Sequence, residues 1–259
     1  DEVYYAGDIT RQGSNAEFQL VDERITGHKP KSLSFAEAAA LPLTTITGWE
    51  ALFDRLGVCQ PATGNNNAAV GQTLLVISGA GGVGSITIQL AKWAGLTVIA
   101  TASRPETQDW VKQLGADHVV DHRQPLPPQL AALGHKEVDL IANFSDTDAY
   151  WPVMAELIRP QGKIVAIVEN KGPLEVGLLK SKSATFAWEF MFTRSMFQTP
   201  DMGAQGALLN EVAALVDAGV LKTTVTEVLS PISAATMKEA HARSESGRTI
   251  GKLVIEGWA

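Results

Sequence analysis

The sequence predicts an α/β protein in which helices cover both faces of a doubly wound parallel sheet. The first observation is a short apolar run at 74–77, which is typical of a buried central strand. A glycine-rich turn and a helix with one apolar face follow it directly. The second is that strand-like and helical patterns then alternate up to about residue 190. Such alternation favours parallel strands joined by right-handed crossover helices.

The turn after the first strand carries the pattern G-x-G-x-x-G on Gly79, Gly81 and Gly84. If a dinucleotide binds here, Gly79 permits the tight turn and Gly81 lets the backbone approach the pyrophosphate. Gly84 lets the helix pack closely on the strand. Because the motif lies between a strand and a helix, we interpret it as a dinucleotide site rather than a purely structural turn. The predicted contact residues of the turn are Gly79, Ala80, Gly81, Gly82, Val83 and Gly84.

The segments around this unit are predicted from the same kinds of pattern. Ser34 and Glu37 have the spacing of a capping box at the start of a helix. Strands are predicted at 3–5, 16–21, 97–101, 118–120, 138–142, 163–168, within 184–190, and at 223–229 and 252–255. Helices are predicted within 34–57 and at 83–95, 105–114, 126–133, 147–158, 203–218 and 234–245, and a surface loop at 61–69.

Composition excludes several classes of protein. The 259 residues, 45% of them hydrophobic, suffice for one large domain or a domain and a half. A net charge of −7 argues against a nucleic-acid partner. Apolar runs fall short of the ~18 residues that cross a membrane, so we expect no membrane partner. The single cysteine, Cys59, excludes an internal disulfide. These features predict a cytoplasmic protein. Because the chain begins at Asp1 within a strand-like pattern, we also expect it to be a fragment of a longer protein.

The end of the strand at 97–101 indicates which dinucleotide is bound. An NAD site usually has a carboxylate about 20 residues after the glycine turn, where it binds the ribose hydroxyls. Ser103 and Arg104 occupy this position instead, and they suit the 2′-phosphate of NADP. Alternatively, Ser103 caps the next helix with Glu106 as its partner, an interpretation compatible with the first.

The sequence does not predict a metal site. His118 and His122 are four residues apart, but ligands at that spacing share a face only on a helix, and this stretch is predicted to be a strand. One cysteine and scattered histidines do not form the usual three- or four-ligand zinc site.

Taken together, these motifs resemble the medium-chain dehydrogenase/reductase superfamily, in its zinc-free quinone oxidoreductase-like branch. The resemblance covers essentially the whole chain, and it implies a Rossmann-type sheet with a partial GroES-like, β-rich substrate domain. The implied domains are residues 1–28 as the end of the substrate domain, 29–222 as the dinucleotide-binding domain, and 223–259 as the return to the substrate domain. The residues that carry the resemblance are 39–52, 79–85, 89–92, 114–121 and 251–254.

The resemblance also implies roles for individual residues. Thr47 matches a threonine that faces the nicotinamide, and Ser103 and Arg104 match the 2′-phosphate position. Lys252 lies near the cofactor in relatives. The remaining implied cofactor contacts are His122 beside the adenosine, Phe144 and Val168 at strand ends, and Phe192 beside the nicotinamide. No catalytic residue is assigned.

The activity that the resemblance implies is hydride transfer from NADPH to a quinone, an enone or a similar activated carbonyl acceptor. The enzyme would be a quinone/alkenal reductase-like oxidoreductase with a small-molecule substrate, and it would form a homodimer. Two alternatives stay open. One is an NADPH-binding module or redox sensor without catalysis, and the other is a zinc-type alcohol dehydrogenase whose metal ligands lie upstream.

Overall fold

The computed structural model describes residues 1–61 and 71–258 and divides the chain into two compact units. Unit 1 combines Asp1–Thr47 with Phe190–Ala259, and unit 2 is Gly48–Glu189. Unit 2 is therefore shorter than the range 29–222 that the family resemblance implies for the dinucleotide-binding domain. The loop predicted at 61–69 lies, beyond residue 61, outside the described residues.

Unit 2 contains a six-stranded parallel sheet with the order β5-β4-β3-β6-β7-β8, which confirms the predicted fold class. From β3 the chain adds β4 and β5 on one side of the sheet, and it then crosses back to add β6, β7 and β8 on the other side. The order in which strands are added therefore reverses between β3 and β6, although all the strands are parallel. Ligands of open α/β sheets bind at such a reversal, beyond the carboxyl ends of the strands. The strands are β3 (Thr73–Ile77), β4 (Thr97–Thr101), β5 (His118–Val120), β6 (Val138–Asn143), β7 (Ile158–Ala166) and β8 (Thr185–Trp188).

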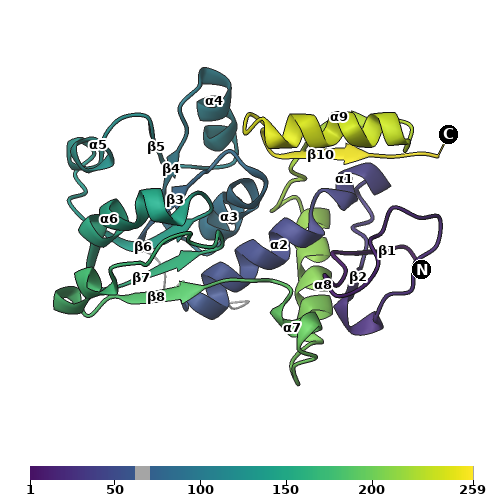
Figure 1. The fold of residues 1–259 in the computed structure, drawn as a ribbon, viewed down its shortest axis with the longest axis horizontal. Coiled ribbons are helices and arrows are strands. Elements are labelled where there is room, and N and C mark those ends of the chain that lie inside the picture. The colour runs from purple at the N-terminus through teal and green to yellow at the C-terminus, as the bar shows by residue number, and fades with distance from the viewer. Residues whose placement is uncertain (62–70, 259) are drawn as a thin grey trace. The chain divides into compact units, whose positions relative to one another are not determined.

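Helices cover both faces of this sheet (Figure 1). Helices α5 (Leu126–Ala132) and α6 (Thr147–Leu157) bury apolar side chains against alternate residues of the central strands, including Leu75 and Ile141. Helices α3 (Gly82–Trp93) and α4 (Pro105–Gln113) follow β3 and β4 and lie on the opposite face. The central strand β3 is fully buried from end to end, as expected when helices cover both of its faces.

A π-helical segment is the main departure from the predicted helices. Helix α2 (Pro42–Trp49) continues into η2 (Glu50–Arg55), where the Leu56 amide donates to the Ala51 carbonyl at 2.9 Å. This five-residue spacing widens the helical turn. In the sequence, the apolar pattern of 49–56 indicates an ordinary helix, because side-chain periodicity does not show how the backbone hydrogen bonds are spaced.

Unit 1 contains two two-stranded sheets. β1 (Val3–Tyr5) pairs antiparallel with β2 (Thr26–His28), and β9 (Val225–Leu229) pairs parallel with β10 (Lys252–Ile255). The strand predicted at 16–21 is wrong: this segment forms no strand, and Phe18 and Leu20 are 91% and 83% exposed. Alternation of apolar residues does not make a strand where no neighbouring strand pairs with it.

The remaining elements of unit 1 are helical or turn segments. The capping box predicted at Ser34 is confirmed, because its side chain accepts from the Glu37 amide and Glu37 bonds back to the Ser34 amide. No helix among the described residues is both long enough and apolar enough to cross a membrane. The helices are α1 (Phe35–Ala39), α7 (Thr193–Met196), α8 (Ala204–Asp217) and α9 (Ala234–Glu245); short 3-10 turns are η1 (Glu23–Ile25) and, in unit 2, η3 (Val176–Lys182).

Candidate functional site

The glycine turn joins the carboxyl end of β3 to the start of α3, at the point where the winding reverses. Its first residue, Ser78, has a left-handed backbone with φ of 67°, an uncommon conformation for a residue other than glycine. The Ser78 amide donates to the Thr101 hydroxyl at 2.9 Å, and the Gly81 amide donates back to the Ser78 carbonyl at 3.2 Å. These bonds hold the turn closed beneath the first turn of α3.

The packing around Gly84 and Gly79 explains why larger residues are excluded at these two positions, and the contact at Gly81 is tight. A Cβ on Gly84 would lie 2.3 Å from the Ser78 carbonyl oxygen, and one on Gly79 would lie 2.9 Å from the Cβ of Ala100. A Cβ on Gly81 would lie 3.3 Å from the Ser78 hydroxyl oxygen. Helix α3 starts at Gly82, and amides of a first helical turn have no acceptor within the helix. The turn therefore fits a pyrophosphate, which needs close backbone approach and amide donors.

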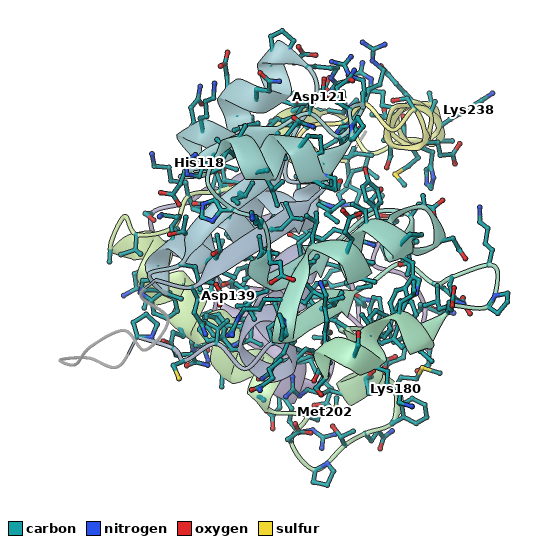
Figure 2. All side chains as sticks on the ribbon, turned by 90° about the vertical axis from the view of Figure 1, so that its left-hand side faces the viewer. His118, Asp121, Asp139, Lys180, Met202 and Lys238 are labelled. Atoms are coloured by element: carbon teal, nitrogen blue, oxygen red, sulfur yellow. The ribbon has the colours of Figure 1, made fainter. Side chains whose placement is uncertain are left out.

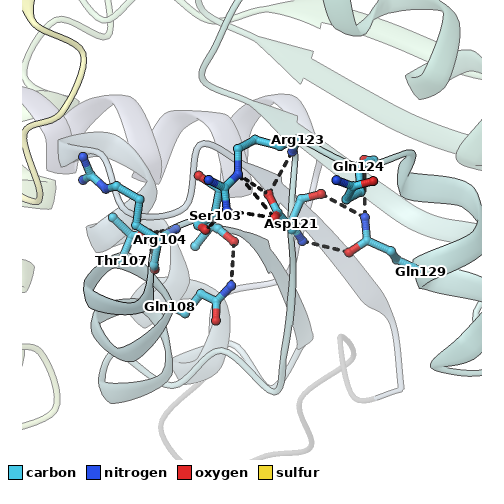
Figure 3. A network of polar contacts seen from close by, with 9 residues as sticks. Ser103, Arg104, Thr107, Gln108, Asp121, Arg123, Gln124 and Gln129 are labelled. Carbon is cyan, nitrogen blue, oxygen red and sulfur yellow. Dashed lines mark hydrogen bonds and ion pairs between the residues drawn. The ribbon is translucent and has the colours of Figure 1, made fainter.

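Ser103 and Arg104 follow β4 at the same edge of the sheet (Figure 3). Ser103 does not cap helix α4, contrary to the alternative drawn from the sequence. The helix begins one residue later, with Arg104 at the N-cap and its amide donating to the Thr107 hydroxyl at 3.0 Å. The Arg104 guanidinium lies 3.0 Å from the Glu106 carboxylate. Because Arg104 is the N-cap residue, the Ser103 hydroxyl does not cap helix α4.

Arg123 is a neighbour that the sequence interpretation missed. It follows β5, and its guanidinium donates to the Ser103 carbonyl oxygen and pairs with the Asp121 carboxylate at 3.1 Å (Figure 3). The Asp121 hydrogen bonds from Arg123 lower the pKa of that carboxyl group. The available signal is topological: the carboxyl ends of adjacent parallel strands meet at one edge, so residues after β5 lie beside those after β4.

Three other predicted contact residues also lie in unit 2. Phe144 follows β6, and its amide donates to the Ile77 carbonyl at 3.2 Å, so its backbone lies beside the start of the glycine turn. Val168 follows β7 and is 38% exposed, with its carbonyl accepting from the Thr147 hydroxyl at 2.6 Å. His122 follows β5 and is exposed beside Arg123. All three therefore follow strands at the edge that carries the glycine turn.

The predicted contact residues Thr47, Phe192 and Lys252 belong to unit 1. Thr47 is buried on α2, where its hydroxyl donates to the Leu43 carbonyl at 2.9 Å. Phe192 packs edge-on against Phe190, with ring centroids 5.6 Å apart. Lys252 begins β10 in an open hollow whose other lining residues include Pro42 and Leu253, and burial lowers its pKa.

The histidines lie on separate elements of both units: His28 ends β2 and His241 is on α9 in unit 1, and the other three are in unit 2. His118 begins β5 and Asp121 follows its far end, so the two lie at different levels of the sheet (Figure 2). The ring of His118 instead faces that of His135, with centroids 5.9 Å apart. Within residues 1–61 and 71–258, no three His, Cys, Asp or Glu side chains are grouped to hold a metal ion. Cys59 is a free, exposed thiol.

The sheet order, the glycine turn at the reversal and the open strand ends define a dinucleotide-binding α/β domain of the oxidoreductase type. Residues 114–255 match the family described as zinc-binding dehydrogenase, and a relative from Staphylococcus aureus is 43% identical over 98% of this chain and 75% of its own length. The chain therefore belongs to the zinc-binding dehydrogenase family of the medium-chain dehydrogenase/reductase superfamily, and it is an oxidoreductase of that superfamily.

Other known proteins give the same assignment. The relative from Staphylococcus aureus is named a zinc-type alcohol dehydrogenase-like protein. The 2-methylene-furan-3-one reductase of Solanum lycopersicum is 31% identical over 98% of this chain and 57% of its own length. The crystal structure of a putative zinc-dependent alcohol dehydrogenase from Rhizobium etli CFN 42 is 54% identical and superposes with a TM-score of 0.93, covering 100% of this chain and 74% of that one.

Proposed function

We propose that the protein is an NADPH-dependent oxidoreductase that transfers hydride to a small quinone, enone or similar activated carbonyl acceptor. The observation that carries the choice of cofactor is the end of β4, where Ser103 and Arg104 stand in place of a carboxylate. A carboxylate there would bind the bare ribose of NADH and repel a 2′-phosphate. The Asp121 carboxylate nearby is already paired with Arg123, so its charge is balanced locally.

In this proposal the protein binds and orients the cofactor. The reduced nicotinamide supplies the hydride, and the chain's own residues determine where the dinucleotide lies. The amides of the glycine turn bind the pyrophosphate, and the Ser103 hydroxyl and the guanidinium groups beside it bind the 2′-phosphate. Asp121 is ionised and paired with Arg123 across the neutral range, and its lowered pKa extends this pairing to more acidic pH.

The acceptor class is supported by the chemistry of the relatives. The tomato relative is named a reductase of a 2-methylene-furan-3-one, a compound in which a carbon–carbon double bond is conjugated to a ketone. Hydride transfer to a conjugated enone or a quinone does not require a metal ion. The same acceptor class is therefore proposed for this chain.

The test is to measure NADPH and NADH oxidation at 340 nm by the purified protein over a panel of quinones, enals and enones. Saturated aldehydes and ketones serve as the control acceptors. We expect turnover with at least one conjugated acceptor and a preference for NADPH. Tight NADPH binding without turnover of any acceptor would contradict the enzymatic proposal, and zinc-dependent oxidation of alcohols would favour the zinc-type alternative.

We also propose that the protein is a cytoplasmic homodimer. The outermost strand β8 has one side unpaired among the described strands and carries Trp188, which is 42% exposed. Unpaired edges with exposed apolar side chains favour association with a second chain. Light scattering coupled to size-exclusion chromatography should give the mass of two chains, and a monomer at micromolar concentration would refute this.

A further inference from the structure

Two buried glutamates contact each other in unit 2, outside the glycine turn. Glu50, in the π-helical segment η2, is completely buried, and Glu189, directly after β8, is 2% exposed. A hydrogen bond with Glu50 is one of the causes that raise the pKa of Glu189, and one buried oxygen of each carboxyl group, Glu50 Oε2 and Glu189 Oε1, has no other hydrogen-bond partner among the described residues. Arg55, one turn after Glu50, lies 2.8 Å from the Glu189 carboxylate and 3.9 Å from that of Glu50.

The charges of this cluster do not balance if both carboxyl groups are ionised. One guanidinium facing two carboxylates leaves a net negative charge among buried atoms, and isolating a charge from water is costly. Two ionised carboxylates also have no donor to share, because each offers only acceptors. One proton on the pair supplies the donor for the hydrogen bond and brings the cluster to neutrality.

We infer that Glu50 and Glu189 share a single proton. The hydrogen bond that this proton forms stabilises the contact between η2, at the start of unit 2, and the residue that follows β8, at the end of unit 2. The two residues are the third and the last of the unit. Their contact therefore closes the ends of the segment that carries the whole six-stranded sheet.

The other charges around the pair agree with this assignment. Burial, followed by the proximity of Glu50, raises the pKa of Glu189 to about 8, although Arg55 acts in the opposite direction. The neighbouring acid on η2, Asp54, is exposed. The Lys163 ammonium, on β7, lies beside Gly57, which follows the end of η2. A Cβ built on Gly57 would lie 2.8 Å from the Lys163 Nζ atom. Among the described ion pairs, Arg55 is the cation placed against both carboxylates.

The direction of the pH effect follows from linkage. When η2 opens, Glu189 returns to an ordinary carboxyl pKa near 4.3, so the closed form binds the extra proton between that value and about 8. Over this range the opening constant rises by about tenfold per pH unit for one proton. Above about pH 8 neither form holds the proton, and the opening constant becomes constant.

Hydrogen-exchange mass spectrometry on the full chain tests this directly. Peptides covering residues 50–58 and 185–190 would be followed at pH 5.5 and 7.5, with rates corrected for intrinsic exchange. In the wild type we expect the opening constant to rise by at least about tenfold between these pH values. The substitutions Glu189→Gln and Glu50→Gln, made separately, should each remove most of this rise.

The matched control is Glu137→Gln, which removes an exposed carboxylate paired with Lys182 at 3.1 Å and should keep the wild-type rise. A wild type without any rise, or a Glu189→Gln variant that keeps it, would overturn the inference. If the glutamine variants do not fold, carbon-13 NMR of the wild-type glutamate carboxyl groups decides. One of the two should stay protonated at pH 6.5, and two ionised carboxylates at that pH would overturn it.

Discussion

The backbone amide of Ser78 donates a 2.9 Å hydrogen bond to the side-chain hydroxyl of Thr101, which joins the end of β3 to the end of β4. Ser78 holds a left-handed conformation in which the glycine turn begins, and Thr101 is buried, with 1% exposure. The neighbouring Gly79 amide donates to the Thr101 carbonyl at 3.2 Å. Thr101 thus supports the dinucleotide turn from the adjacent strand without belonging to the turn itself.

Replacing Thr101 with Val should destabilise the protein and weaken dinucleotide binding. Valine keeps the shape but leaves the partly buried Ser78 amide without its acceptor, a loss of about 1 kcal/mol. Chemical denaturation measures the stability, and fluorescence titration with NADPH measures the affinity. Thr97→Val on the same strand is the control, because among the described residues the Thr97 hydroxyl makes no hydrogen bond. Equal behaviour of the two variants would contradict the role of Thr101.

Replacing Gly84 with Ala should abolish tight binding of either dinucleotide. The new Cβ would lie 2.3 Å from the Ser78 carbonyl and 2.7 Å from that of Gly79, so the first turn of α3 must move away from β3. Affinities for NADPH and NADH should fall together, because the pyrophosphate is common to both. Gly177→Ala is the control, since a Cβ there meets nothing within 4 Å. Wild-type affinity in Gly84→Ala would argue against a cofactor at this turn.

The sequence predicts the sheet of unit 2 well because its strands are buried and its helices are amphipathic. The pattern at 74–90 places the turn between β3 and α3, and the structure has it there. The prediction fails at 16–21, where alternation of Phe18 and Leu20 with polar residues indicates a strand. Alternation specifies only which face is apolar, whereas pairing depends on a neighbour that a local pattern does not contain.

The candidate site is predicted only in part for a related reason. Glycine spacing is a local signal, and so is the Ser103–Arg104 pair after β4. The Arg123 contact with Ser103 joins residues 20 positions apart, and the Glu189 contact with Arg55 joins residues 134 positions apart. Such contacts depend on strand order, which follows from the complete winding of the sheet. The local patterns around Arg123 and Glu189 therefore do not reveal these contacts.

Removing Arg104 should reduce the affinity for NADPH and leave that for NADH almost unchanged. A hydrogen bond to a charged phosphate contributes roughly 1.5–3 kcal/mol, which corresponds to a loss of about one to two orders of magnitude. Parallel titrations of wild type and Arg104→Ala with both cofactors measure this.

Arg123→Ala should also favour NADH over NADPH, because it leaves the Asp121 carboxylate without its partner beside Ser103. Arg159→Ala is the control for both arginine variants, because Arg159 lies at the start of β7 and is paired at 2.6 Å with Asp139 at the start of β6, at the amino ends of the strands. Equal wild-type affinities for the two cofactors, or parallel losses in Arg104→Ala, would refute the 2′-phosphate assignment.

The raised pKa of Glu189 makes the global stability depend on pH in a defined direction. The folded-state pKa of about 8 exceeds the ordinary carboxyl value of about 4.3, so the folded state binds the extra proton between them. The free energy of unfolding should therefore fall with rising pH by up to about 1.4 kcal/mol per unit in this window, superimposed on the effects of other groups. Urea denaturation at several pH values from 5 to 9 should show this slope in the wild type and a smaller one in Glu189→Gln. Glu137→Gln, on the surface, should match the wild type.

A slope that is unchanged by Glu189→Gln would mean that Glu189 is already ionised when folded. The buried negative charge would then need compensation that Arg55 alone does not provide.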